Sequence, residues 1–245
     1  MILVLVARVK NTRTAMEKKF NVIVIGSGPG GYVAAIKAAQ LGFETAVVER
    51  ANLGGICLNW GCIPTKALLK SAQALHYAQD GESYGFSIDG EIKVDIAKVV
   101  ERSRGVSAQM SKGVEYLLKK NKVTVINGDA SLTPDKKVAV KSGEGVELYE
   151  ADHIILATGA RPNSLPFAPI DGKKIISYFQ ALIPEKLPKS MAIIGSGAIG
   201  SEFAFFYKSM GVEQVHLIEY LDRIVPLEDD EVSAQLSRSF RKMGI

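Results

Sequence analysis

Cys57 and Cys62 are the residues of this sequence best suited to redox or nucleophilic chemistry. They are the only cysteines in 245 residues, and they lie five positions apart in the segment LGGICLNWGCIPTK. The apolar spacing over residues 67–79 predicts a helix, and Pro64 suits its first turn, where the missing N–H costs little. Both sulfurs would then lie near a helix N-terminus, which favours the thiolate, and Lys66 would add positive charge on the same face.

Several kinds of site compete for this pair. Zinc is disfavoured because the spacing is not that of a usual ligand pair and the three histidines are scattered. A structural disulfide would be unusual in a chain of this size without an export signal, and two unrelated buried cysteines are a plain alternative. The flanking glycines let the backbone approach a flat or anionic group; they are Gly54, Gly55 and Gly61. The residues therefore favour a redox-active dithiol, while a structural disulfide and two unrelated buried cysteines stay open as alternatives.

A glycine-rich turn near the start of the chain has the order of elements expected of a dinucleotide site. Residues 21–25 predict a buried strand and residues 32–41 a helix. Three glycines form a G-x-G-x-x-G between them, at Gly26, Gly28 and Gly31. A second strand over residues 45–48 ends at Glu49, 23 positions after the first glycine. Together these features indicate a dinucleotide-binding βαβ unit.

Each residue of this pattern has a physical role. Gly26 makes the tight turn, Gly28 lets the backbone approach a pyrophosphate, and Gly31 lets the helix pack on the strand. The phosphates would bind at the helix N-terminus, and Glu49 would accept hydrogen bonds from ribose hydroxyls. An ordinary βαβ turn would leave the position of this acid unexplained.

The same pattern occurs a second time. Predicted strands at residues 191–194 and 214–218 flank another G-x-G-x-x-G, and the second strand ends at Glu219, 24 positions after the first glycine. The glycines are Gly195, Gly197 and Gly200. A carboxylate at Glu219 suits the free ribose hydroxyls of NAD and repels the extra phosphate of NADP. Two such patterns predict two dinucleotide cofactors, the second being NAD.

The segment between the two patterns predicts further elements. Residues 94–120 have long helical spacing, and residues 123–126 predict a strand that leads into a turn at residues 128–130. A hairpin is predicted from residues 136–141 and 146–149, and a separate buried strand from residues 153–156.

Two stretches carry a resemblance to a known family. GPGGYVAAIKAAQLG (residues 28–42) and GGICLNWGCIPTKALL (residues 54–69) resemble the pyridine nucleotide–disulfide oxidoreductases, which are flavoproteins. The details resemble the branch that oxidises protein-bound dihydrolipoamide. The resemblance implies that electrons pass between that substrate, the cysteine pair, FAD and NAD, with Cys57 as the interchange thiol and Cys62 as the flavin-side thiol. Another disulfide reductase of the family, of the glutathione or mercuric type, is the alternative.

The resemblance also implies further cofactor contacts. Gly128 and Ala130 would contact the adenine of FAD, and Thr158 and Gly159 would close the first pass through the FAD domain. Glu202 lies where family members carry a glutamate that pairs with the lysine after the cysteines. We therefore predict an ion pair between Lys66 and Glu202, across two domains and beside the flavin and nicotinamide.

Composition and pattern together give an α/β fold. A doubly wound, Rossmann-like FAD domain with a small antiparallel insert is predicted at residues 19–160, and a partial NAD domain of the same type at residues 161–245. A disordered leader is predicted at residues 1–18. A net charge of +4 with dispersed basic residues favours neither nucleic acid nor a membrane surface, and no apolar run approaches the ~20 residues of a membrane span.

The remaining expectations also follow from the resemblance. Family members continue beyond the point matching Ile245 and carry a dimer-forming domain with a His–Glu acid/base pair, so we expect the chain alone to turn over little, or to act as an FAD-binding fragment. The resemblance implies a homodimer that serves lipoyl domains and the acyltransferase core of a 2-oxo acid dehydrogenase complex. A cytoplasmic location is expected, or the mitochondrial matrix if the basic leader is a transit peptide.

Overall fold

The computed structural model describes residues 18–143 and 145–245. Contacts between Cα atoms divide the chain into two units, each built from two stretches of sequence. The first holds the residues up to Ala51 together with Leu117–Thr158, and the second holds Asn52–Tyr116 together with Gly159–Ile245. The predicted leader lies outside the described residues, except for Lys18, which begins the first strand.

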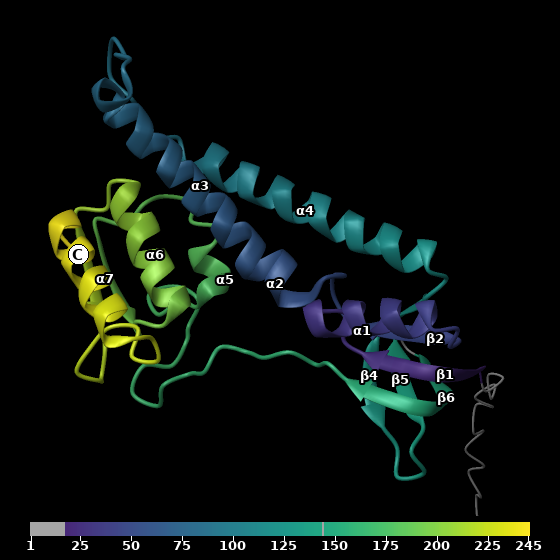
Figure 1. Cartoon of the computed structure of the whole chain (residues 1–245). Helices are drawn as coiled ribbons and strands as arrows, with labels where there is room; N and C mark the ends of the chain where they lie inside the picture. Colours follow the sequence, from purple (N-terminus) through teal and green to yellow (C-terminus); the bar gives the residue numbers. More distant parts are fainter. Residues whose placement is uncertain (1–17, 144) are drawn as a thin grey trace, which may run out of the picture. The chain divides into compact units, whose positions relative to one another are not determined.

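A six-stranded sheet in the order β3-β2-β1-β6-β5-β4 forms the centre of the first unit (Figure 1). β1 pairs in parallel with β2 and β6, and β2 pairs in parallel with β3. β5 is antiparallel to both β4 and β6. The strands are β1 (Lys18–Ile25), β2 (Thr45–Glu49), β3 (Thr124–Asn127), β4 (Asp129–Leu132), β5 (Val138–Ser142) and β6 (Gly145–Leu156). The unit therefore has the predicted α/β character, with parallel strands extended by an antiparallel part.

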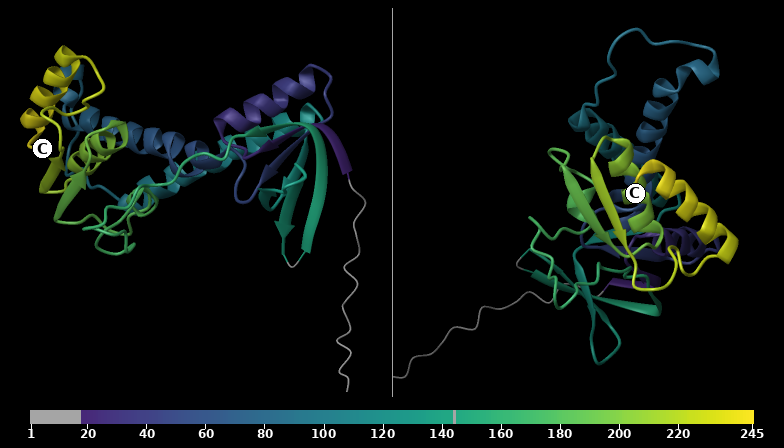
Figure 2. Two further views of the ribbon diagram at one scale, coloured as in Figure 1. Left: turned by 90° about the horizontal axis from the view of Figure 1, so that it is seen from below. Right: turned by 90° about the vertical axis from the view of Figure 1, so that its left-hand side faces the viewer.

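The apolar residues of β1 and β2 are buried on both faces of the sheet. Helix α1 (Pro29–Gln40) covers one face (Figure 2), and the fully buried Val24 and Val47 lie on that side by the alternation of the strands. On the other face, Ile23 of β1 packs in one cluster with Val138 and Val140 of β5. Burial on both faces explains why these strands are continuous apolar runs.

β6 corrects the prediction of two separate strands at residues 146–149 and 153–156. The structure has one twelve-residue strand, whose beginning pairs with β5 and whose longer remainder pairs with β1. The polar residues between the two runs suggested a break. Their polar groups have partners on β1 instead: Asp152 accepts a hydrogen bond from Asn21 Nδ2 at 3.0 Å and forms an ion pair with Lys19 at 3.0 Å.

β4 corrects the prediction of a simple turn at residues 128–130. Asp129–Leu132 forms a strand antiparallel to β5, with Ala130 opposite Val140. Gly128 joins β3 to β4, and the position must be glycine because a Cβ there would lie 2.6 Å from the carbonyl oxygen of Lys141. The strand was missed because its sequence is short and polar, and its partners lie across the hairpin.

The second unit consists mainly of helices packed with a two-stranded parallel sheet, β7-β8. Its elements are α2 (Gly55–Trp60), α3 (Cys62–Gln79), the 3₁₀ helix η1 (Gly81–Tyr84), α4 (Ile96–Lys120, whose last turn belongs to the first unit), α5 (Tyr178–Ala181), β7 (Ser190–Ile194), α6 (Ala198–Ser209), β8 (Gln214–Ile218) and α7 (Asp230–Met243). No helix in the described part of the chain is long and apolar enough to cross a membrane.

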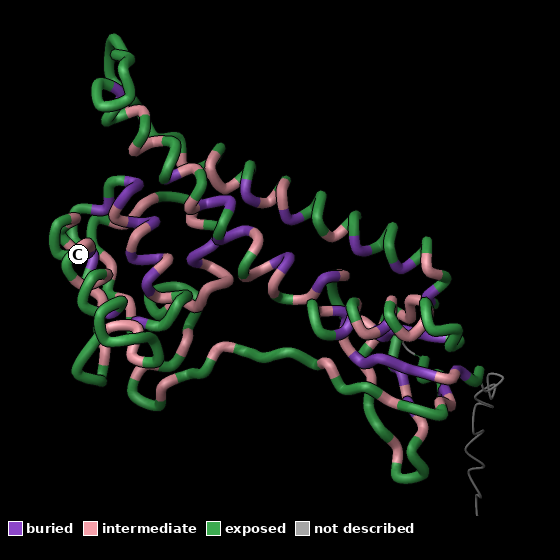
Figure 3. Tube along the Cα trace, viewed as in Figure 1, coloured by how far each residue is buried: buried purple, intermediate pink, exposed green. Residues whose placement is uncertain are grey.

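The core of the second unit lies between α3 and α6 (Figure 3). Leu68 and Ala72 of α3 pack in one cluster with Phe206 and Tyr207 of α6, and all four are almost fully buried. The hydroxyl of Tyr207 donates to the carbonyl oxygen of Ala181 at 2.8 Å, and burial raises the pKa of this phenol. This packing holds the middle of α3 against the second half of α6.

The predicted helix at residues 67–79 is longer than the sequence suggested and has a separate helix before it. α3 begins at Cys62, whereas Cys57 lies in the short helix α2. Gly61 separates the two helices with φ −148° and ψ −115°. Cys62 is the first residue of α3 and Cys57 is the third residue of α2, so each sulfur lies near a helix N-terminus, but on two separate helices where one was predicted.

Candidate active site

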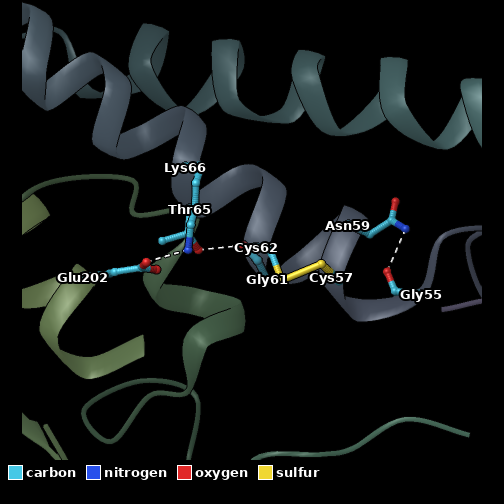
Figure 4. Close-up of a disulfide and its surroundings, with 8 residues drawn as sticks. All are labelled: Gly55, Cys57, Asn59, Gly61, Cys62, Thr65, Lys66 and Glu202. Atoms are coloured by element: carbon cyan, nitrogen blue, oxygen red, sulfur yellow. Dashed lines mark hydrogen bonds and ion pairs between the residues drawn. A yellow bond between two sulfur atoms is a disulfide. The ribbon is translucent and has the colours of Figure 1, made fainter. Parts of the chain in front are cut away.

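The two cysteines form a disulfide that bridges α2 and α3 (Figure 4). Their Cα atoms lie 4.7 Å apart. Cys62 is exposed and lies at the N-terminus of α3, where unpaired N–H groups favour negative charge on sulfur. Cys57 is half-buried. The dithiol obtained on reduction would thus consist of two sulfurs in different electrostatic environments.

The first turn of α3 is fixed by backbone and side-chain contacts. Thr65 donates from its hydroxyl to the carbonyl oxygen of Gly61 at 2.6 Å, and from its backbone N–H to the same oxygen at 3.0 Å. At the start of α2, Gly54 has φ +90° and Gly55, the first residue of the helix, has φ +60°, both in the left-handed region that favours glycine. These two glycines therefore have a structural reason to be glycine, separate from any cofactor contact.

Lys66 and Glu202 form the ion pair that the sequence predicted. Lys66 Nζ lies 2.5 Å from Glu202 Oε1, one turn along α3 from Cys62 (Figure 4). The prediction placed this pair across two domains, whereas both residues belong to the second unit, since α3 and α6 pack within it. The Glu202 side chain is 25% exposed and that of Lys66 is 60% exposed. The pair therefore links the helix that carries Cys62 to the first turns of α6.

The first glycine pattern has two glycines that the chain itself requires and one that it does not. Gly26 has φ +99°, and a Cβ there would overlap the carbonyl oxygen of Ala157. A Cβ on Gly31 would overlap the carbonyl oxygen of Gly26, which is how α1 approaches β1 so closely. Gly28 has φ −63° and open space where a Cβ would point. Since no contact within the chain accounts for Gly28, its lack of a side chain fits close approach by a bound group at the start of α1.

Glu49 is held by donors on both carboxylate oxygens. Oε2 accepts from the backbone N–H of Ser27 at 3.0 Å and from its hydroxyl at 2.6 Å. Oε1 accepts from the N–H of Ala51 at 2.9 Å. The acid thus lies beside the glycine turn, as predicted. Its lone pairs are partly used by the protein, so a ribose hydroxyl would share them.

The second pattern repeats this geometry. Ser196 donates to Glu219 Oε2 from its N–H at 3.0 Å and from its hydroxyl at 2.6 Å. A Cβ on Gly200 would overlap the carbonyl oxygen of Gly195, whereas Gly197 has φ −61° and open space. The hydroxyl of Ser196, and then the N–H groups of Leu221 and Ser196, lower the pKa of Glu219 to about 2. Glu219 is therefore a carboxylate at neutral pH.

The geometry agrees with comparisons to known proteins. A family model described as pyridine nucleotide-disulphide oxidoreductase matches residues 20–245. The chain belongs to this family. It is 50% identical over 245 residues to the dihydrolipoyl dehydrogenase of Rhizobium etli and 51% identical over 231 residues to that of Zymomonas mobilis. Each match covers 94% of this chain but only 51% and 49% of the relative, so the chain spans about half the length of these curated relatives.

Two solved structures have a similar fold. LpdA from Mycobacterium tuberculosis superimposes with a TM-score of 0.84 at 27% identity, over 93% of this chain and 50% of LpdA. RclA, a flavoprotein disulfide reductase from Escherichia coli, gives 0.78 at 26% identity, over 93% of this chain and 48% of RclA. The α/β fold is thus that of the pyridine nucleotide-disulphide oxidoreductases.

The remaining residues predicted to contact a cofactor lie on or directly after strands of the first unit. Gly128 joins β3 to β4, and Ala130 lies on β4. Thr158 follows the end of β6, where Ala157 N donates to the carbonyl oxygen of Ile25 at 2.8 Å. Gly159 has φ +72°. Gly128 is required by the β3–β4 bend, so its glycine does not by itself indicate a ligand.

One set of contacts around the disulfide was missed by the sequence analysis. Arg104 of α4 donates to the carbonyl oxygen of Asn59 at 2.5 Å, and Ser111 Oγ donates to Asn59 Oδ1 at 3.0 Å. α4 was interpreted only through its apolar positions. A signal was present, because Ser103, Ser107 and Ser111 recur every four residues, and small polar residues at this spacing permit close packing against another helix. Ser103 indeed donates to the carbonyl oxygen of Pro64 at 3.0 Å.

Proposed function

We propose that this chain carries the electron-transfer residues of a dihydrolipoyl dehydrogenase, which oxidises protein-bound dihydrolipoamide with NAD through FAD. The observation that carries the proposal is the Cys57–Cys62 disulfide at the start of α3, with Lys66 one turn further on and paired with Glu202. The two glycine patterns and the curated relatives at about half identity support it.

The dithiol step is a thiol–disulfide exchange. A thiolate of dihydrolipoamide attacks Cys57 Sγ, which forms a mixed disulfide and releases Cys62 as the thiolate. The second substrate thiol, on losing its proton, attacks the substrate sulfur of the mixed disulfide, which releases cyclic lipoamide and leaves Cys57 reduced. Two electrons and two protons leave the substrate, and the protein disulfide becomes a dithiol. The N-terminus of α3 stabilises the Cys62 thiolate formed in the first step.

The residues expected to hold FAD fit a dinucleotide. The open space at Gly28 and the buried Ser27 that fixes Glu49 leave the start of α1 free for phosphates. The other proposed contacts are Gly26, Gly31, Gly54, Gly55, Gly128, Ala130, Thr158 and Gly159. When bound, FAD supplies two-electron chemistry between the dithiol and the pyridine nucleotide, and the protein supplies alignment and electrostatic tuning.

NAD is proposed for the second pattern, at Gly195, Gly197, Gly200 and Glu219. The ionised Glu219 supports NAD over NADP, because a carboxylate repels a ribose phosphate. Lys66 and Glu202 are proposed to lie beside the flavin and nicotinamide. We also propose that residues 19–160 form the FAD-binding domain and that residues 161–245 form part of the NAD-binding domain, as the sequence predicted.

Turnover needs an acid/base group for the substrate thiols, and the described residues offer no histidine in that role. The His76 ring packs edge-on against Phe205 with ring centres 5.6 Å apart. His153 lies opposite Val22 in the first sheet, and His216 lies opposite Ala192 in the second. We therefore propose little turnover by this chain alone. The working form is proposed to be a homodimer that serves lipoyl domains and an acyltransferase core, in the cytoplasm or the mitochondrial matrix.

The test is a visible absorption spectrum of the purified chain with FAD, before and after dithiothreitol. A flavin spectrum with a long-wavelength charge-transfer shoulder on reduction is the expected result. Cys57→Ser should keep that shoulder and Cys62→Ser should lose it, because the latter removes the flavin-side thiolate. A chain that binds no FAD, or a shoulder that depends on Cys57 instead, would contradict the proposal.

A further inference from the structure

Asn59 and Trp60, the last two residues of α2, lie between the cysteines and have an unusual number of contacts. Asn59 is 6% exposed, and its side-chain amide donates to the carbonyl oxygens of Leu53 at 3.0 Å and Gly55 at 2.9 Å. Its side-chain oxygen accepts from Ser111 of α4 at 3.0 Å. Every part of this side chain is therefore satisfied, and it ties α2 to the residues before it and to α4.

Arg104 provides a second connection between the end of α2 and α4. Its guanidinium donates to the carbonyl oxygen of Asn59 at 2.5 Å, and its Cζ lies 4.3 Å from the centre of the Trp60 ring. Trp60 also packs on Phe179 of α5, with ring centres 5.3 Å apart. A planar guanidinium can donate and stack at once, which lysine cannot do. We call Asn59 and Trp60, with Arg104, Ser111 and Phe179, the Trp60 anchor.

These contacts involve none of the sulfur atoms, so they do not depend on the disulfide being closed. α2 is only six residues long and has no side-chain cap at its N-terminus. A helix this short has little stability of its own in water. Once the disulfide opens, the Trp60 anchor is what keeps Cys57 at a fixed place relative to Cys62, because α3 carries Cys62 on a separate, well-packed helix.

We infer that the Trp60 anchor, and Arg104 in particular, holds the reduced cysteines in the spacing of the disulfide and so favours its re-formation. Arg104 is a positioning residue that acts through Asn59 and Trp60. A restrained dithiol loses less conformational freedom on closure than a loose one, which raises the effective concentration of one thiol at the other. The inference rests on the proposed function for its catalytic meaning, but its test requires neither FAD nor a lipoyl substrate.

An electrostatic role for Arg104 would have the opposite sign. A cation near the sulfurs stabilises thiolates and so favours the reduced form. Removing it would then make the disulfide harder to reduce and raise the pKa of the thiols. Removing a positioning residue makes the disulfide easier to reduce and leaves the thiol pKa unchanged. The sign of one equilibrium measurement therefore separates the two roles.

The experiment equilibrates the full chain with mixtures of reduced and oxidised dithiothreitol and counts free thiols by alkylation and mass spectrometry. Each exchange reduces one protein disulfide and oxidises one dithiothreitol. For Arg104→Gln we expect the equilibrium to move about tenfold toward the protein dithiol, a potential less negative by about 30 mV. Arg104→Lys should behave like the glutamine variant, because lysine keeps the charge but not the planar contacts.

Two further variants test whether the shift in equilibrium is specific to the Trp60 anchor. Arg102→Gln is the matched control: Arg102 lies on the same helix and donates to the carbonyl oxygen of Ala67 at 2.8 Å, away from the residues between the cysteines. It should leave the equilibrium within about twofold of the parent. Phe179→Leu loosens Trp60 without changing charge and should shift the equilibrium the same way as Arg104→Gln, which keeps the test open if the arginine variant does not fold.

An unchanged equilibrium in Arg104→Gln, or a shift toward the disulfide, would overturn the inference, and so would an equal shift in Arg102→Gln. Recovery of the parent value by Arg104→Lys would also overturn it, since charge would then suffice. Loss of FAD binding with the expected thiol equilibria would refute the proposed function and leave the Trp60 anchor standing.

Discussion

Ser196 donates two hydrogen bonds to one carboxylate oxygen of Glu219, from its N–H at 3.0 Å and its hydroxyl at 2.6 Å. Ser27 and Glu49 repeat the arrangement with the same two distances in the other unit. The acid at the end of the second strand is thus fixed by the residue between the first two glycines. The distance in sequence between the first glycine and the acid is therefore explained in part by this contact, and not by a ligand alone.

The contact between Ser196 and Glu219 predicts a pH-dependent stability. The pKa of Glu219 is about 2 in the folded chain and 4.5 for an unperturbed carboxyl. A carboxylate with a lowered folded pKa stabilises the folded state above pH 4.5, and this contribution is lost as the pH falls toward 2. Ser196→Ala should therefore lower the urea midpoint at pH 7 and differ less from the parent near pH 2.

Ser209→Ala serves as the control for that experiment. Ser209 also lies in the second unit, and its buried hydroxyl has no hydrogen-bond partner in the described structure. Its removal should leave the pH dependence of the urea midpoint as in the parent. Equal pH profiles for Ser196→Ala and the parent would mean that the hydroxyl does not set the ionisation of Glu219.

Gly200 and Gly197 should respond differently to alanine. Gly200→Ala forces a methyl group onto the carbonyl oxygen of Gly195 and should lower the free energy of unfolding by about 1–3 kcal/mol. Gly197→Ala meets open space at an ordinary φ and should change the free energy of unfolding by no more than about 1 kcal/mol while weakening NAD binding. Thermal melts and NAD titrations check the pair, and equal loss of stability in both would contradict the assignment.

The ion pair between Lys66 and Glu202 should matter little for stability. Both side chains are partly exposed, so the coupling energy in a cycle of Lys66→Met and Glu202→Gln should be at most about 1 kcal/mol. The free energy of unfolding in urea gives this value for each single variant and for the double variant. A coupling of several kcal/mol would show that the pair is structural, against its proposed place beside the cofactors.

The two thiols should differ in reactivity once dithiothreitol has opened the disulfide. Without FAD, Cys62 should be alkylated by iodoacetamide several-fold faster than Cys57, because it is exposed and lies at the N-terminus of α3. With FAD bound, the order should reverse if Cys62 is the flavin-side thiol. Peptide mapping after short alkylation measures both rates, with Cys57→Ser and Cys62→Ser as references.

The predictions that held depend on local sequence. The order of strand, glycines, helix and acid is specified within about 30 residues, so β1, α1 and β2 and their counterparts β7, α6 and β8 were found close to their observed bounds. The ion pair of Lys66 with Glu202 was predicted by the resemblance, since nothing local connects residues 136 positions apart.

The predictions that failed depend on distant partners. Residues 150–152 were left between two predicted strands, yet they continue one strand in which Asp152 contacts Lys19 and Asn21 of β1. The contact of Arg104 with Asn59 joins residues 45 positions apart, and an arginine on a helix predicts only a solvated face. Gly61 divided the cysteine segment into two helices, although the apolar period after it predicted one.

β6 runs without interruption from the hairpin with β5 to the glycine turn at Gly26. Its first residues form the hairpin with β5, and its end leads directly to Ala157, whose carbonyl oxygen excludes a side chain at Gly26. Twelve residues of extended strand span about 40 Å, with no loop between to absorb an error. A one-residue slip in the hairpin would therefore displace the glycine turn at the far end, so a segment remote from the nucleotide site sets its alignment.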